Sequence, residues 1–281
     1  PFNVTAGEAY VANLPAAKDV QVPGAPPPGE VSLDLSAGTW HLIGNPFGVP
    51  LEWDVDTIRY QQNRGPWSQL RNVIGTQNRP VEFYVWKLSP MDSSYRVVCG
   101  NGVLPTGESR IGVGEGAWIY TGGAGVTLSL ARPTRVAPPR QAVPSFAADH
   151  WAVELIARVG DACDRSNYLG LSSRFGPAGL NLPGPPAIAD QFVDLALAPA
   201  NTAGPRSLAM AISGENLTRA TWSVDVTTNV VNGQVSLSWP DLSALPRNCR
   251  LRLVDLATGR AVSMRSASAY TYRAENAAVS R

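Results

Sequence analysis

Three acidic side chains alternate along one stretch of this chain, and their spacing is the first that could carry chemistry. Glu52, Asp54 and Asp56 are separated by two apolar residues, so an extended strand would place all three carboxylates on one face. A glycosidase needs two carboxylates that face each other across the bond to be cut. Because three carboxylates on one strand point the same way, the pattern predicts a solvated strand edge and not a hydrolase.

A second set of oxygen-bearing side chains consists of Asp161, Asp164 and Asn167. Carboxylate and amide oxygens are ligands that Ca²⁺ prefers, so a calcium site in a loop between strands is one interpretation. Asp and Asn also hydrogen bond to their own backbone in turns, and a polar turn without metal is the alternative. The three residues are the candidate calcium ligands, and no other cofactor is expected.

Aromatic side chains are the third candidate. Trp53, Tyr60 and Trp67 follow Pro46 in a region where regular strands are hard to recognise. Exposed rings on a β-sandwich present flat, partly polar surfaces on which sugar rings stack, so the three residues are candidate sugar contacts. The alternative is that the eight Trp residues of the chain are mostly core, because large aromatic side chains are usually buried.

Other reaction chemistries lack the residues they need. The only two histidines, His41 and His150, are isolated in the sequence, whereas acid–base or metal chemistry needs partners close by. Neither a zinc-protease motif nor a serine-hydrolase motif occurs. The glycine-rich segment 112–116 leads into a predicted strand and not a helix, so it predicts a tight turn and not a phosphate site. We expect a protein that is not an enzyme.

Composition narrows the partners and the location. A net charge of +1 gives no electrostatic reason to bind nucleic acid, and no apolar run is long enough to span a membrane. A charged fraction of 16% with few lysines favours an extracellular or cell-surface protein. The three cysteines are expected to be buried thiols, with a Cys163–Cys249 disulfide as the alternative.

The elements that would position these residues are strands. Alternating apolar and polar residues predict strands over 31–35, 81–86, 151–159, 222–227 and 235–239. Asn232-Gly233 lies between the last two and predicts a tight hairpin. Strands at this spacing, joined by turns and without a convincing helix, predict an all-β protein of tandem β-sandwich modules, Ig-like or jelly-roll-like.

Proline divides the chain into modules. Pro lacks the N–H donor of a sheet ladder, so proline-rich stretches predict extended connectors. One connector is expected at 23–30 and a second at 132–146. They separate a β-sandwich at 31–131 from a C-terminal β-sandwich at 147–281. Residues 1–22 remain as the end of a preceding β-unit or a strand-donating segment, because Phe2–Val11 parallels Arg110–Ile119.

Several of these segments resemble β-modules of large secreted bacterial proteins. Gly38–Phe47 (GTWHLIGNPF) resembles the "GWNLIGNPF" signature of modules near the C-termini of such proteins. The second half resembles the β-sandwich that often follows them. The matching pieces are Trp151–Leu155, Asp164–Gly170, Val235–Trp239 and Leu253–Gly259. The resemblance implies a structural, export-associated region and no activity, although the chain stops where related domains continue with a final Arg- and Phe-rich strand.

The sequence therefore predicts a non-catalytic extracellular structural, assembly or adhesion protein. An incomplete β-module exposes a strand edge, which can recruit a strand from another chain. The expected partners are other copies of the chain or neighbouring domains of a longer one, joined by strand exchange. The alternative is a carbohydrate-binding accessory region of a secreted bacterial enzyme, with polysaccharide as the partner.

Overall fold

The structure is a computed structural model of the 281-residue chain. It describes residues 5–10, 24–76, 78–89, 94–100, 102–104, 108–133, 150–176, 179–187, 190–199, 208–214 and 219–274. The chain divides into two compact units. The first unit comprises residues 1–88 and 97–144, and the second comprises residues 89–96 and 145–281.

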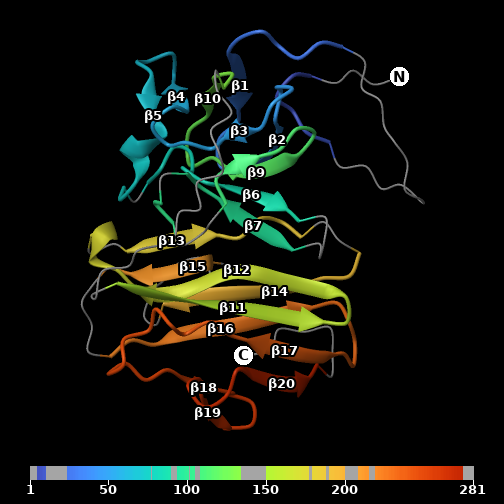
Figure 1. Ribbon diagram of the computed structural model, residues 1–281, viewed down its shortest axis with the longest axis vertical. Coiled ribbons are helices and arrows are strands. Elements are labelled where there is room, and N and C mark those ends of the chain that lie inside the picture. Colours follow the sequence, from blue (N-terminus) through green and yellow to red (C-terminus); the bar gives the residue numbers. More distant parts are fainter. Residues whose placement is uncertain are drawn as a thin grey trace. The chain divides into compact units, whose positions relative to one another are not determined.

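The first unit is built from short strands in three small sheets (Figure 1). One sheet has the order β1-β10-β4-β5, a second has the order β2-β9-β6-β7, and β3 pairs with β8. A 3₁₀ turn, η1, spans Leu70–Val73. The strands are β1 (Val31–Leu35), β2 (Trp40–Gly44), β3 (Leu51–Glu52), β4 (Arg59–Gln62), β5 (Ser68–Gln69), β6 (Val85–Leu88), β7 (Tyr95–Val98), β8 (Arg110–Ile111), β9 (Gly116–Tyr120) and β10 (Val126–Leu130). Of β7, only Val97 and Val98 belong to this unit.

The stretch after β2 shows how the sequence turns the chain there. The Asn45 amide donates to the carbonyl oxygens of Val49, Ile111 and Gly112 at 2.9–3.1 Å, and its side-chain oxygen accepts the Phe47 N–H. One side chain thus satisfies backbone groups of two segments that are distant in sequence. Phe47 is almost completely buried, so the turn is fixed by hydrogen bonds on one side and by apolar burial on the other.

The second unit has one large sheet of longer strands and a separate β18-β19 hairpin (Figure 1). The main order is β16-β14-β15-β12-β11-β17-β20, and β13 also pairs with β15. A 3₁₀ turn, η2, spans Ser173–Phe175. The strands are β11 (Trp151–Val159), β12 (Ala162–Leu171), β13 (Leu180–Pro183), β14 (Val193–Pro199), β15 (Leu208–Ser213), β16 (Trp222–Thr228), β17 (Gln234–Ser238), β18 (Arg252–Val254), β19 (Ala261–Ser263) and β20 (Ala269–Arg273).

The β11–β12 hairpin contains a β-bulge. Leu155 pairs with Asn167, but Ala157 then pairs with Asp164, so β12 carries one more residue than β11 between these two pairs. Ser166 has a positive φ of 65° at this point, and its N–H donates to the Glu154 carboxylate at 3.1 Å. The bulge is therefore held by a side chain of the facing strand.

The prediction of an all-β protein is confirmed at the level of class, since no α-helix occurs in the part of the chain that the structure describes. The alternation along β11 is also confirmed. Its inward residues pack in the core of the second unit: Trp151, Val153, Leu155, Ala157 and Val159.

Two local predictions are wrong. Asn232 does lie in a turn, with φ of 58° and a hydrogen bond from Gly233 N–H to Val230 carbonyl oxygen, but the turn closes no hairpin. Strand β16 before it pairs with β14, whereas β17 after it pairs with β11 and β20. Residues 81–86 are buried on both faces instead of alternating. The 23–30 connector is non-strand over its described residues 24–30, and most of the 132–146 connector lies outside the described residues.

Candidate functional site

The outer edge of β2 carries an added segment from the start of the chain. The N–H of Gly44 donates to the Gly7 carbonyl oxygen at 2.8 Å, and the N–H of Ala9 donates to the Leu42 carbonyl oxygen at 3.4 Å. Glu8 lies opposite Ile43 as an antiparallel pair. Two such backbone hydrogen bonds contribute about 1–3 kcal/mol together. Residues 7–9 therefore extend the β2-β9-β6-β7 sheet by one short, weakly held strand.

Glycines make room for this segment. A Cβ atom on Gly44 would lie 2.7 Å from the Glu8 carbonyl oxygen, and a Cβ atom on Gly116 would lie 2.8 Å from the Ala9 Cβ. Both distances are shorter than real Cβ contacts allow, and neither neighbour is the far end of a flexible side chain. The segment that contains Glu8 and Ala9 can therefore approach β2 and β9 this closely only because both positions are glycine.

The added segment begins with the same turn that precedes β9. The Glu8 N–H donates to the Thr5 carbonyl oxygen at 3.2 Å, and the Glu115 N–H donates to the Gly112 carbonyl oxygen at the same distance. The residue before each glutamate is a glycine with positive φ, 87° at Gly7 and 74° at Gly114. The parallel between residues 2–11 and 110–119 thus extends to backbone geometry, and the tight turn predicted at 112–116 is confirmed.

The described part of the connection from this segment back to β1 is mostly exposed, at residues 24–26 and 28–30. Tyr10 is 47% exposed, and its hydroxyl donates to the Glu8 carboxylate within the segment itself. The contacts described for residues 7–9 with the rest of the chain are those with β2 and β9, and those of Gly7 with Val31 and Leu33. The sequence predicts that residues 1–22 end a preceding β-unit or donate a strand, and their described part, residues 5–10, pairs inside this chain.

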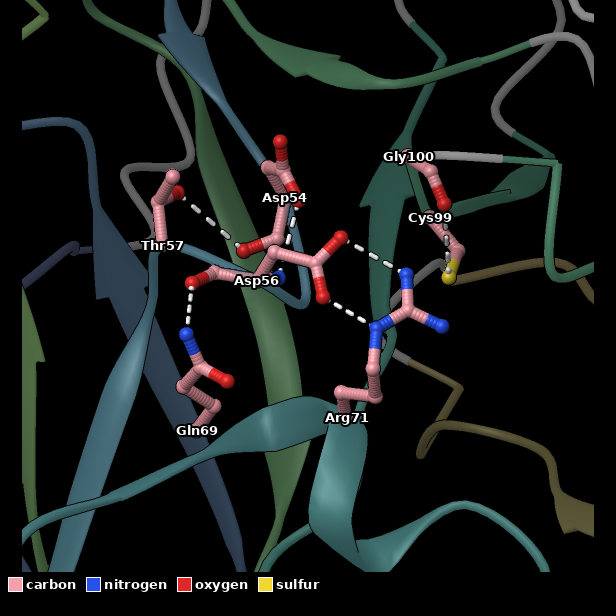
Figure 2. Close-up of polar contacts among 7 residues, drawn as sticks. All are labelled: Asp54, Asp56, Thr57, Gln69, Arg71, Cys99 and Gly100. Carbon is pink, nitrogen blue, oxygen red and sulfur yellow. Dashed lines mark hydrogen bonds and ion pairs between the residues drawn. The ribbon is translucent and has the colours of Figure 1, made fainter.

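The three carboxylates 52, 54 and 56 do not share a strand face. Strand β3 ends at Glu52, whose carboxylate pairs with Arg110. Figure 2 shows that Asp54 and Asp56 instead lie in the following turn, where the Asp54 carboxylate accepts the Asp56 N–H at 2.8 Å. The prediction of a solvated strand edge is therefore wrong, because the strand stops two residues before Asp54.

The Asp56 carboxylate is held by a cation from a neighbouring segment (Figure 2). The guanidinium of Arg71, in η1, donates to both of its oxygens. This hydrogen bonding raises the pKa of Arg71, and the Asp56 carbonyl oxygen also accepts the Gln69 side-chain amide at 2.7 Å. The cluster ties the 54–57 turn to β5 and η1. These contacts are a structural ion pair and hydrogen bond. They do not provide the two facing carboxylates that a glycosidase needs.

The three candidate aromatic residues do not form one surface. Trp53 is fully buried, and its indole N–H donates to the Phe83 carbonyl oxygen at 3.0 Å, so the prediction that it contacts a sugar is wrong. Tyr60 is partly exposed on β4. Trp67 is 39% exposed next to β5, and the Arg59 guanidinium lies 5.5 Å from its ring centroid. Only Tyr60 and Trp67 remain as surface aromatic residues of the predicted set.

The candidate calcium ligands are spread along the β11–β12 hairpin. Asp161 is exposed in its turn, whereas Asn167 is buried opposite Leu155. The Asp164 carboxylate accepts the Leu195 N–H of β14 at 2.6 Å. Burial, and then the charge of Asp194, raise the pKa of Asp164 to about 8. Among the described residues, no three His, Cys, Asp or Glu side chains are grouped to hold a metal ion. The calcium site stays a prediction.

The cysteines form no disulfide. Cys99, Cys163 and Cys249 are all free thiols, so the alternative of a Cys163–Cys249 bond is wrong. Two features of the structure have little or no signal in the sequence. Gly44, against which residues 8 and 9 lie, stands out in the sequence only as part of the Gly44-Asn45-Pro46-Phe47 motif. Nothing in the sequence marks Asp194 as a neighbour of Asp164.

Comparison of the chain with protein-family models, with curated proteins and with solved structures finds no match. None of the described helical segments has the length and apolar character needed to cross a membrane. The strand-accepting edge of β2, defined by Leu42–Gly44 and Gly116 and called the β2 seat below, is therefore the feature of this chain on which a functional argument can rest.

Proposed function

We propose that this protein is a non-catalytic extracellular structural, assembly or adhesion protein, built from tandem β-sandwich modules that associate by strand exchange. The observation that supports this most directly is the pairing of residues 7–9 with the edge of β2. A segment distant in sequence lies along the sheet edge, and residues 24–26 and 28–30 of its connection to β1 are exposed.

Strand addition suits an assembly role for a physical reason. Backbone N–H and C=O groups along a sheet edge provide affinity for any extended chain, and the neighbouring side chains decide which chain fits. In the β2 seat, selection comes from the absence of side chains at Gly44 and Gly116. No buried catalytic group is needed for this activity.

The proposal is tested by mass in solution. The full chain, followed by light scattering over a concentration series, is expected to gain mass as its concentration rises. A chain without residues 1–10 is expected to stay monomeric, because it has no strand to donate. Equal association of both chains would contradict assembly by strand exchange. Fractionation of cells that produce the natural protein, with detection in the medium or on the surface, tests the extracellular location.

A carbohydrate-binding accessory region is the second candidate, and Trp67 is the observation in its favour. Its ring is 39% exposed beside the partly exposed Tyr60 strand, and flat aromatic surfaces of this kind stack on sugars. Trp67→Ala is then expected to abolish retention on a panel of insoluble polysaccharides, measured by pull-down. Retention of the variant, or no retention of the wild-type chain, would argue against this function.

A further inference from the structure

We infer that the β2 seat accepts residues 5–10 of a second copy of this chain, in the register that residues 5–10 occupy within one chain. This inference rests on the proposed function and deepens it, because it names the donor, the acceptor and the residues that align. In this register Glu8 of one copy lies opposite Ile43 of the other, and the Gly44 N–H meets the Gly7 carbonyl oxygen.

The choice of occupant follows from the fit of the seat. Gly44 and Gly116 leave space for backbone and for a methyl group, and Ala9 supplies that methyl group. Gly7 is buried and has a φ of 87°, a conformation that strains any residue with a side chain, so glycine is favoured there as well. An arriving strand therefore needs glycine, any residue, then alanine, and residues 7–9 have this pattern.

The segment can be exchanged because the contacts described between it and β1, β2 and β9 are equally available in a second copy of the chain. Exchange of an identical element between copies creates no new interface, and its cost is low. A strand tethered to its own sheet competes with the strand of another copy at an effective concentration on the order of 1 mM. Free chains well below this concentration are expected to remain closed, and exchange becomes prominent as the protein approaches about 1 mM.

Glu8 provides a position for a probe, because it is exposed and its carboxylate accepts only the Tyr10 hydroxyl among the hydrogen bonds described for it. A Glu8→Cys chain, with Cys249→Ser to remove the half-buried thiol, would carry a nitroxide spin label. This spin-labelled chain would be mixed with a ¹⁵N-labelled wild-type chain that carries no spin label. Amide signals of the ¹⁵N chain then report only on contact with the labelled copy.

We expect the amide signals of Leu42, Ile43 and Gly44 to be lost in the mixture, increasingly so toward about 1 mM. Gly44→Ala in the ¹⁵N chain is expected to prevent this loss, because the added Cβ meets the Glu8 carbonyl oxygen. Gly123→Ala is the matched control in the same unit, since its Cβ would meet nothing within 4 Å, and it should behave as wild type.

Two outcomes would overturn the inference. The first is that the amide signals of Leu42–Gly44 stay unchanged in the mixture at about 1 mM. The control is a ¹⁵N chain with the spin label on its own position 8, which should lose those signals and so shows that the label reaches them. The second is signal loss that spreads over other surfaces and survives Gly44→Ala. Light scattering of the unmodified chain tests assembly in general. Association in that experiment without loss of the β2 amide signals would contradict the inference but not the proposed function.

Discussion

The two units bury acidic groups in opposite surroundings. In the first unit, Glu82 is buried with the Arg79 guanidinium 2.6 Å away, and this cation opposes the rise in the pKa of Glu82 that burial causes. In the second unit, Asp164 is partly buried near another carboxylate, Asp194, whose charge adds to the rise in the pKa of Asp164. Burial acts in the same direction in both units, so the charge of the neighbour decides how strongly each responds to pH.

The two cores differ in the strands that carry them. The largest fully buried side chains of the first unit are aromatic and include Trp53, Tyr84 and Trp86, and its strands have two to five residues. The second unit also buries aromatic rings, Trp151 and Trp239 among them, but its strands have up to ten residues, as in β12. We therefore expect the second unit to be more sensitive to changes in strand register.

The largest effect is expected from Trp53→Ala in the first unit. This change removes a fully buried ring and leaves the Phe83 carbonyl oxygen without its indole donor, at a cost of about 3–5 kcal/mol. Urea unfolding followed by circular dichroism should lose stability only in the transition of the first unit. Trp67→Ala, at a partly exposed ring, is the control and should cost about 1 kcal/mol or less.

Gly170→Ala is the corresponding test of the second unit. A Cβ at Gly170 would lie 2.1 Å from the Trp151 carbonyl oxygen on the paired strand, so the β11–β12 hairpin must distort, at a cost of about 1–3 kcal/mol or more. Gly184→Ala is the control, because its Cβ would make an ordinary 3.8 Å contact with Ala209. Equal thermal unfolding of the two variants would refute the importance of strand register here.

Asp164→Asn sharpens the electrostatic contrast. Because the folded state raises the pKa of Asp164 from 3.8 to about 8, the folded chain keeps a proton that the unfolded chain loses above pH 4. The stability of the second unit should then fall as pH rises from about 4 to 8, by about 1 kcal/mol or more in total. In urea unfolding, the free energy of unfolding of Asp164→Asn should therefore change less with pH between pH 5 and 8 than that of the wild-type chain. Asp161→Asn, in the exposed turn, is the control and should keep the wild-type dependence.

The smallest expected effect concerns the β18-β19 hairpin. The Asp255 carboxylate accepts the Ala257 N–H and the Tyr270 hydroxyl at 2.8 and 2.6 Å, and these bonds, with the Tyr270 bond first, lower the pKa of Asp255. Asp255→Ala should cost about 1 kcal/mol near neutral pH. Since a lowered pKa gives stability that is lost on acidification, this cost should shrink below pH 4. Amide hydrogen exchange across 255–270 would measure it.

The sequence was sufficient to predict strands, but not always their partners. Alternation located β1, β11, β16 and β17 because each has one apolar face. The turn at Asn232 was visible too, yet local turn chemistry says nothing about whether the flanking strands pair with each other or leave for different neighbours. Here β16, before the turn, pairs with β14, whereas β17, after the turn, pairs with β11.

The candidate sites were harder to predict for a related reason. Trp53 and Trp67 are the same residue type in the same loop-rich stretch, and only packing distinguishes the buried ring from the exposed one. Asp164 is perturbed by Asp194, a residue thirty positions away on β14, the strand whose Leu195 N–H donates to the Asp164 carboxylate. The glycines of the β2 seat acquire their meaning only once residues 7–9 lie against them.

The bulge in β12 divides that strand into two phases. On one side of Ser166 the core-facing residue is Ala162, an even-numbered position, and on the other side it is Leu169, an odd-numbered one. Positions 164 and 167 both face the same side as the core residues of β11, with two residues between them instead of one. Straightening the strand without removing a residue would turn one half of it inside out. The bulge therefore accommodates one additional residue in β12 without changing which side chains reach the core.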